Sequence, residues 1–142
     1  MAGFNPNNLT FEEGLDRIRK TTGGRYLGGK EIVTSRDDNM ASVTRELRTR
    51  NVPDGFTKWQ LPVALDGPSQ FFMSYAAPEI TVPPHSHDEG DGLRIIVSGS
   101  IIYDGKELGP GDWMYIPRGT RYDFKVGEKG AGMAYCYQCC CA

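Results

Sequence analysis

The stretch PPHSHDEGDGLRIIVSG, residues 83–99, contains the only two histidines of this 142-residue chain and a run of apolar residues after them. In an extended strand, residues two apart point to the same face, so the imidazoles of His85 and His87 would project side by side. That arrangement suits two adjacent coordination positions of one transition metal. The stretch therefore predicts a strand that carries a polar site, followed by a second strand over 93–97.

Short apolar runs separated by turn residues extend on both sides of this stretch, which is typical of an all-β sandwich or barrel. The runs are residues 31–34, 71–75, 80–82, 93–97, 100–103, 112–116, 122–126 and 133–137. Glycine and proline mark the predicted turns at residues 104–105, 109–111, 117–119 and 127–130. Eight short strands are enough for a small barrel. Residues 34–67 have the least clear secondary-structure pattern of the chain.

One short amphipathic helix is predicted near the start, at about residues 10–21. Thr10 and Glu13 have the spacing of a capping box, in which each side chain accepts a hydrogen bond from the backbone of the other. Gly23 and Gly24 end the segment. We therefore expect two parts, an N-terminal helical arm over residues 1–30 and a β-barrel domain over residues 31–142.

Composition argues against several classes of partner. Sixteen Lys and Arg against eighteen Asp and Glu give a net charge of −2, which does not favour a surface built for nucleic acid or an anionic membrane. The N-terminus has no basic leader with an apolar core, and the chain has no apolar run of membrane-spanning length. We expect a soluble, cytoplasmic protein.

Two motifs of this chain resemble those of the cupin superfamily, whose small single-domain members include the RmlC-like cupins. The first family motif has an H-x-H pair, a carboxylate and a final glycine, and the second has glycine, P-x-G and a histidine. The matching positions are His85, His87 and Gly99 in the first motif, and Gly111, Pro117, Gly119 and Tyr122 in the second. The resemblance covers residues 71–137 and implies a jelly-roll barrel, the double-stranded β-helix.

The chain departs from the family pattern at two of the four metal-binding positions. Gly92 stands where the motif has its carboxylate, with Asp91 one residue earlier and Glu89 two residues before that. Tyr122 replaces the third histidine.

Three interpretations of the site remain open. In the first, a one-residue bulge brings Asp91 to His85 and His87, and the resulting two-histidine, one-carboxylate triad suits Fe(II). Mn, Ni, Cu or Zn are alternative metals, and Glu89 is an alternative ligand. In the second, only the two histidines bind the metal. In the third, the metal is lost and the histidines line a binding pocket.

Tyr122 and Arg94 each have two interpretations. The Tyr122 phenol could transfer protons near a metal, or it could be an ordinary strand residue that packs at the rim. Arg94 points inward and could hold a carboxylate if the strand follows the family register. If Asp91 points inward instead, Leu93, Ile95 and Val97 face the interior, and this apolar set is the more ordinary expectation.

All four cysteines lie within the last seven residues, at positions 136, 139, 140 and 141. Cysteines so close together cannot link distant parts of a chain, which fits reduced thiols. Cys136 could face the barrel as a soft ligand, whereas the last three are more simply a frayed end.

The resemblance implies a metal-dependent enzyme acting on a small organic molecule, with non-haem Fe(II) dioxygenase-type chemistry as the leading hypothesis. The alternatives are a non-redox metal-dependent lyase, isomerase or cyclase, and a non-catalytic small-molecule-binding cupin. A homodimer is also expected, because barrel edges need cover and small cupins are often dimers.

Overall fold

The computed structural model describes residues 9–138, and these form two compact units. The first unit holds the described residues up to Gly29 together with Asp38–Ala64, and the second holds Lys30–Asp37 and the described residues from Leu65 onward. The elements are α1 (Phe11–Thr22), β1 (Val33–Thr34), α2 (Met40–Glu46), β2 (Arg48–Thr49), β3 (Lys58–Trp59), β4 (Gln70–Ala76), β5 (Thr81–His85), β6 (Gly92–Tyr103), β7 (Lys106–Leu108), β8 (Trp113–Ile116) and β9 (Tyr122–Tyr137).

The first unit contains both helices and the small β2–β3 pair. Helix α1 begins with the predicted capping box between Thr10 and Glu13 and ends at Gly23, whose φ is 66°. Gln60, in the second segment of this unit, donates a hydrogen bond to the Gly14 carbonyl of α1 at 3.0 Å. Neither helix in residues 9–138 is long and apolar enough to cross a membrane. The unit thus includes residues 38–64, which the sequence analysis had assigned to the barrel domain.

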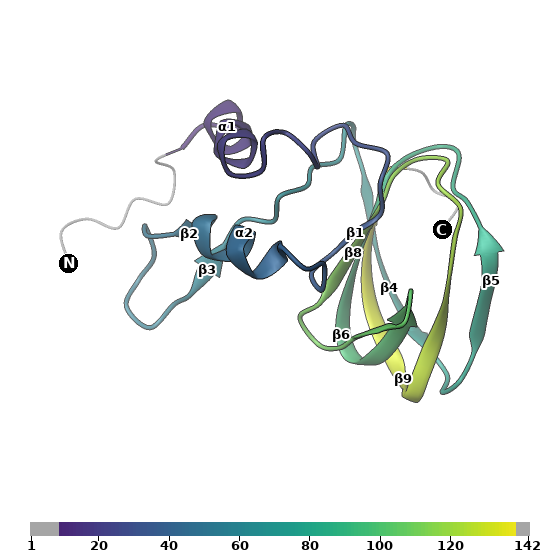
Figure 1. The fold of residues 1–142 in the computed structure, drawn as a ribbon. Coiled ribbons are helices and arrows are strands. Elements are labelled where there is room, and N and C mark those ends of the chain that lie inside the picture. The colour runs from purple at the N-terminus through teal and green to yellow at the C-terminus, as the bar shows by residue number, and fades with distance from the viewer. Residues whose placement is uncertain (1–8, 139–142) are drawn as a thin grey trace. The chain divides into compact units, whose positions relative to one another are not determined.

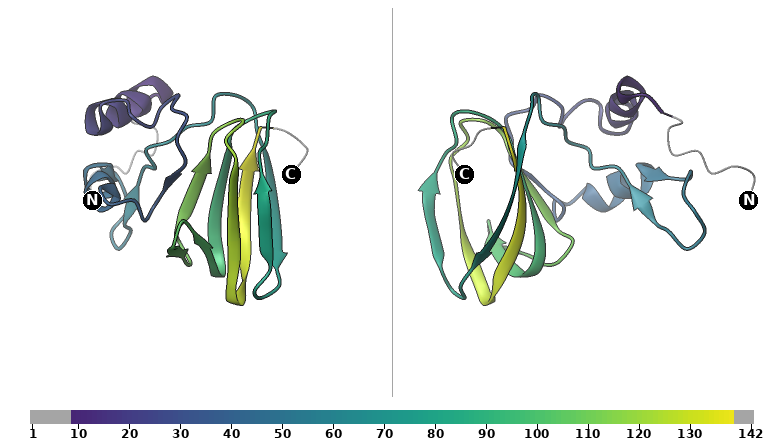
Figure 2. Two further views of the ribbon diagram at one scale, coloured as in Figure 1. Left: turned by 45° about the vertical axis from the view of Figure 1, so that its right-hand side comes forward. Right: turned by 180° about the vertical axis from the view of Figure 1, so that it is seen from behind.

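The second unit is a curved, seven-stranded antiparallel sheet (Figures 1 and 2). Its main path runs β1-β8-β6-β9-β4, while β5 pairs with β9 and β7 pairs with β6. Strand β9 is central, because its first half pairs with β5 and its second half with β4, and β6 pairs along both halves. The predicted mostly-β architecture with an N-terminal helix is confirmed.

The predicted turns are only partly correct. Asp104 and Gly105 form the two-residue turn between β6 and β7, with φ of 50° and 73°. By contrast, residues 127–130, predicted as a turn, lie inside the long strand β9. The pairing of β9 with β6 shifts there by a bulge that follows Gly99. A Cβ atom on Gly99 would lie 1.9 Å from the Gly130 carbonyl oxygen, so this bulge requires glycine.

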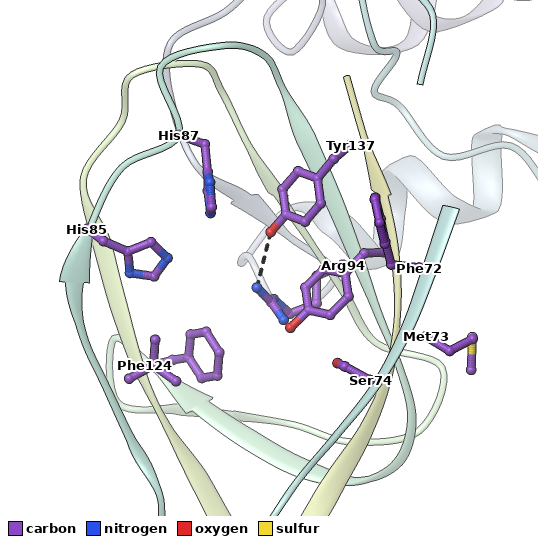
Figure 3. Close-up of a pocket in the computed structure, with 10 residues that line it drawn as sticks. Phe72, Met73, Ser74, His85, His87, Arg94, Phe124 and Tyr137 are labelled. Carbon is purple, nitrogen blue, oxygen red and sulfur yellow. Dashed lines mark hydrogen bonds between the residues drawn. The ribbon is translucent and has the colours of Figure 1, made fainter. Parts of the chain in front are cut away.

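Alternate residues of the strands face the inside of the curved sheet. The core on this inner face has ten buried residues: Ile96, Ile101, Leu108, Met114, Ile116, Tyr122, Phe124, Val126, Ala131 and Met133. The outer face carries apolar side chains that are exposed, including Phe71, Met73 and Tyr75 of β4. Met73 also borders the pocket described below, but its side chain points away from it (Figure 3). Tyr122 and Phe124 of this core also contact the residues of the site, so the core and the site adjoin.

Candidate functional site

A pocket of about 350 Å³ opens on the inner face of the sheet (Figure 3). Aromatic and apolar side chains form most of its wall, and the polar groups are two histidines, an arginine, a serine and tyrosine hydroxyls. Its lining residues are Phe72, Met73, Ser74, Val82, His85, His87, Arg94, Phe124, Tyr135 and Tyr137. Its volume lies in the range of ligand sites for small molecules.

The two histidines lie side by side at this pocket, as their spacing predicts. His85 is the last residue of β5 and pairs with Tyr122, whereas His87 follows the strand and is fixed by a hydrogen bond from the Gly119 amide to its carbonyl oxygen, at 2.9 Å. The ring centroids of His85 and His87 are 5.1 Å apart. The Gly119 turn of the second motif therefore holds the second histidine of the first motif in place.

The protonation of each histidine follows from its surroundings. His85 Nδ1 lies 2.8 Å from the Pro83 carbonyl oxygen, which can only accept, so Nδ1 carries a proton and Nε2 is left without one in the neutral ring. Burial, together with the positive charges of His85 and Arg94, lowers the pKa of His87 below its ordinary value. His87 Nε2 lies 3.4 Å from the Tyr122 hydroxyl.

Arg94 lies on the inner face, and its side chain is only 3% exposed. Its Nη2 donates to the hydroxyls of Tyr122 and Tyr137, at 3.3 and 3.2 Å, and its Nη1 contacts the Met133 sulfur at 3.3 Å. Arg94 Cζ lies 3.7 Å from the centroid of the Tyr135 ring. Arg94 Nε is buried and has no hydrogen-bond partner among the described residues.

The predicted apolar inward register of β6 is therefore wrong. Strand β6 pairs residue by residue with β9 from Gly92 to Ile96, and the first irregularity comes after Ile96. Without a bulge before that point, Arg94 stays on the inner face, while Ile95 and Val97 are 37% and 53% exposed.

Asp91 is engaged away from the pocket. Its carboxylate accepts hydrogen bonds from the Tyr115 hydroxyl at 2.9 Å and from the Arg118 amide at 2.8 Å. Tyr115 alternates in β8 with Met114 and Ile116, which belong to the inner core, so Tyr115 and Asp91 lie toward the outer face. Glu89 is exposed and is not among the residues that line the pocket. The structure thus does not bring either carboxylate to the histidines.

Tyr137 is a pocket residue that the sequence analysis did not single out. Its ring occupies the space above Gly92, where a Cβ atom would lie 2.2 Å from Tyr137 Cε1. Gly92 is the position at which the resemblance places a carboxylate, so the aromatic ring has replaced that side chain. The sequence Tyr135-Cys136-Tyr137 at the end of a predicted strand could have indicated this, since residues two apart share a face and both tyrosines would point to the same side.

Cys136 lies between these two pocket residues in β9 and therefore points away from the pocket. Its thiol contacts the Ser69 hydroxyl oxygen at 3.1 Å. The interpretation of Cys136 as a ligand facing the barrel finds no contact with the histidines to support it. Cys139, Cys140 and Cys141 lie outside the described residues.

The donor set does not fit the predicted three-ligand metal site. Within residues 9–138, no group of three or more His, Cys, Asp or Glu side chains is arranged to hold a metal ion. The carboxylate position is filled by the Tyr137 ring, and the hydroxyl of Tyr122, at the third histidine position, accepts a hydrogen bond from Arg94. A permanent positive charge beside the histidines also opposes a divalent cation.

Comparison with known proteins gives matches among solved structures only. No protein-family model and no curated protein matches the chain. A cupin protein from Bacteroides fragilis matches with 24% identity and a TM-score of 0.42, over 49% of this chain and 64% of that one. An RmlC-like cupin from Shewanella frigidimarina matches with 16% identity and a TM-score of 0.43, over 49% and 64% of the two chains.

Salicylate 1,2-dioxygenase from Pseudoaminobacter salicylatoxidans matches with 11% identity and a TM-score of 0.42, over 49% of this chain and 19% of that one. The chain spans less than two thirds of the length of each of these three proteins. The structural neighbours of this chain are cupin and RmlC-like cupin proteins, and they match about half of it.

Proposed function

We propose that this chain binds a small organic molecule in the pocket on the inner face of its sheet, through protein side chains alone. The observation that carries the proposal is the lining itself, in which a mostly aromatic wall surrounds a few convergent polar groups. Tyr122 is buried and is not among the lining residues. Its hydroxyl lies next to His87 Nε2 and Arg94 Nη2, which belong to lining residues, so Tyr122 is the proposed proton-transfer group, acting through them, if the bound molecule also reacts.

A blocked pocket tests this proposal. Ser74 lines the pocket from β4 and is exposed, so Ser74→Trp would fill the space without disturbing the core. The neighbouring Tyr75 points to the outer face, and Tyr75→Trp is the matched control. Small probe molecules should perturb the backbone NMR signals of the pocket strands in the wild type and in Tyr75→Trp, but not in Ser74→Trp. Binding that is unaffected by Ser74→Trp would contradict the proposal.

A metal-dependent enzyme is the second candidate, with Fe(II) dioxygenase-type chemistry or a lyase, isomerase or cyclase reaction. The pair of histidines favours it, because Nε2 of His85 carries no proton in the neutral ring. Elemental analysis of protein purified without chelator tests this candidate. Near-stoichiometric metal that is lost in the double variant His85→Ala/His87→Ala would favour the enzyme. Metal lost only in a chain ending at Tyr137 would instead indicate the cysteines.

We also propose that two copies of the chain associate through β4. This strand is at the edge of the sheet's main path, contains no charged residue, and exposes Phe71, Met73 and Tyr75 by 83%, 72% and 70%. Charged residues commonly protect an edge strand, and an unprotected edge can pair antiparallel with its own copy about a two-fold axis. Sedimentation of the wild type should give a dimer.

A further inference from the structure

Among the described residues that line the pocket, Arg94 is the only one with a permanent charge, and none of the others carries an opposite charge. Its contacts are two neutral hydroxyls, a thioether sulfur and aromatic rings. No Asp or Glu within residues 9–138 lines this pocket.

A buried guanidinium of this kind is costly to the free protein. Arginine is almost never fully buried unless it is paired, because its charge must leave water. The two tyrosine hydroxyls satisfy Nη2, and the aromatic rings contribute cation–π attraction, but Nε is left without an acceptor. The Arg94 guanidinium therefore lacks a compensating negative charge, and its Nε lacks a hydrogen-bond acceptor.

We propose that the ligand of this pocket is a small monocarboxylate, whose carboxylate binds at the Arg94 guanidinium and whose apolar body packs against the aromatic wall. This inference rests on the proposed function of the pocket and names the chemical class of its ligand. A carboxylate supplies one negative charge and two acceptor oxygens, which match the planar guanidinium.

The lining also favours a carboxylate over other charged ligands. A phosphate group carries about two negative charges at pH 7, and this pocket provides one permanent positive charge. A cationic ligand would be repelled by the same guanidinium. A neutral ligand would leave the charge uncompensated, and a ligand with several charges would have to bury the rest against Phe72, Val82 and Phe124.

Three monocarboxylates and their uncharged amide twins test the proposal. The probes are butyrate, benzoate and phenylacetate, each compared with butyramide, benzamide or phenylacetamide by NMR titration at pH 7. At least one acid should bind about tenfold or more tightly than its amide, which corresponds to about 1.4 kcal/mol. The side-chain Nε–H signal of Arg94, identified by its loss in Arg94→Met, should shift with the acid.

Arg94→Met removes the charge and should abolish the preference for the acid over its amide. Arg121→Met is the control, since Arg121 is exposed and the same charge is removed outside the pocket lining. Arg94→Lys keeps a charge but loses the planar fork, so it should give an intermediate preference. The NMR spectra report at the same time that each variant is folded.

Equal binding of acids and amides, or a preference for the acid that persists in Arg94→Met, would overturn the proposal that the ligand is a monocarboxylate bound at Arg94. If the amides still bound and Ser74→Trp blocked them, the pocket would stand as a small-molecule site and only its assigned ligand class would fall. If neither acids nor amides perturbed the pocket signals, both the monocarboxylate and the proposed binding function would be wrong.

Discussion

Two regions of the curved sheet, the Arg94 site on the inner face and strand β4 on the outer face, depart from the usual arrangement of charge and apolar surface. On the inner face, Arg94 carries a full charge at 3% exposure. On the outer face, Phe71 and Met73 of β4 are 83% and 72% exposed. An ordinary half-buried strand places its apolar residues inward and its polar residues outward. The stability of the single chain does not explain either feature. We relate each one to a proposed partner, an anion at Arg94 and a second copy of the chain at β4.

The largest expected effect comes from adding one methyl group to the inner face. Gly92→Ala would place a Cβ atom 2.2 Å from the Tyr137 ring, and overpacking of this kind should lower the free energy of unfolding by about 3 kcal/mol. Gly109→Ala is the control, because its nearest atom would be 3.9 Å away. Urea denaturation measures both.

A double-mutant cycle sharpens this prediction. In a Tyr137→Ala background the ring is gone, so Gly92→Ala should cost less than half of what it costs in the wild type. An undiminished cost would mean that the ring is not what excludes a side chain from position 92.

On the outer side, Tyr115→Phe should lower the free energy of unfolding by about 2 kcal/mol, because it leaves the buried Asp91 carboxylate without one of its donors. Burial and the bond to Asp91 raise the pKa of Tyr115 well above its ordinary value of 10.0. The folded protein thus keeps this proton where the unfolded chain loses it, so wild-type stability falls as the pH rises above 10. The variant should lack that part of the decline in denaturation curves measured from pH 8 to 11.

Arg94→Met should affect stability in the opposite direction. Replacing a buried charge that lacks a counter-ion with an apolar chain of similar length should raise the free energy of unfolding by about 1 kcal/mol. Thermal unfolding without ligand would show it as a higher midpoint than that of the wild type. A clear loss of stability would mean that the arginine is a structural centre of the inner face, not a site kept for a ligand.

The smallest effect on folding is expected at the exposed edge. Met73→Lys should change the free energy of unfolding of the single chain by no more than about 0.5 kcal/mol, because the side chain is mostly in water. The same change should convert the dimer into a monomer in sedimentation experiments, since it places two charges across the proposed two-fold contact. A dimer that survives it would move the contact away from β4.

The sequence predicts the regular parts of this molecule well. Local signals are sufficient for the helix at its capping box and for the Asp104–Gly105 turn, because both depend on a few neighbouring residues. Likewise, the period of two along a strand is enough to place His85 and His87 side by side. Gly127 and Gly130 mislead, since a glycine that permits a bulge looks the same as one that permits a turn.

The rest of the site depends on long-range pairing that no local pattern reveals. Which face Arg94 takes is decided by its pairing with β9, some forty residues away in sequence, and an arginine in an apolar strand is ordinarily expected to point outward. Tyr137 reaches the pocket for the same reason, since it is paired with Gly92. Local rules thus fail at the group of residues to which we assign a function, which is where such failures are expected.

The contact between Gly92 and the Tyr137 ring also restricts the order in which mutations could accumulate at this pocket. A lineage that gained a side chain at position 92 first would pass through an overpacked, destabilised intermediate, whereas one that shortened residue 137 first would open a cavity that the new side chain could fill. A carboxylate side chain could therefore be gained at position 92 if residue 137 is shortened first, but not in the reverse order. Positions 92 and 137 should accordingly vary together among related sequences.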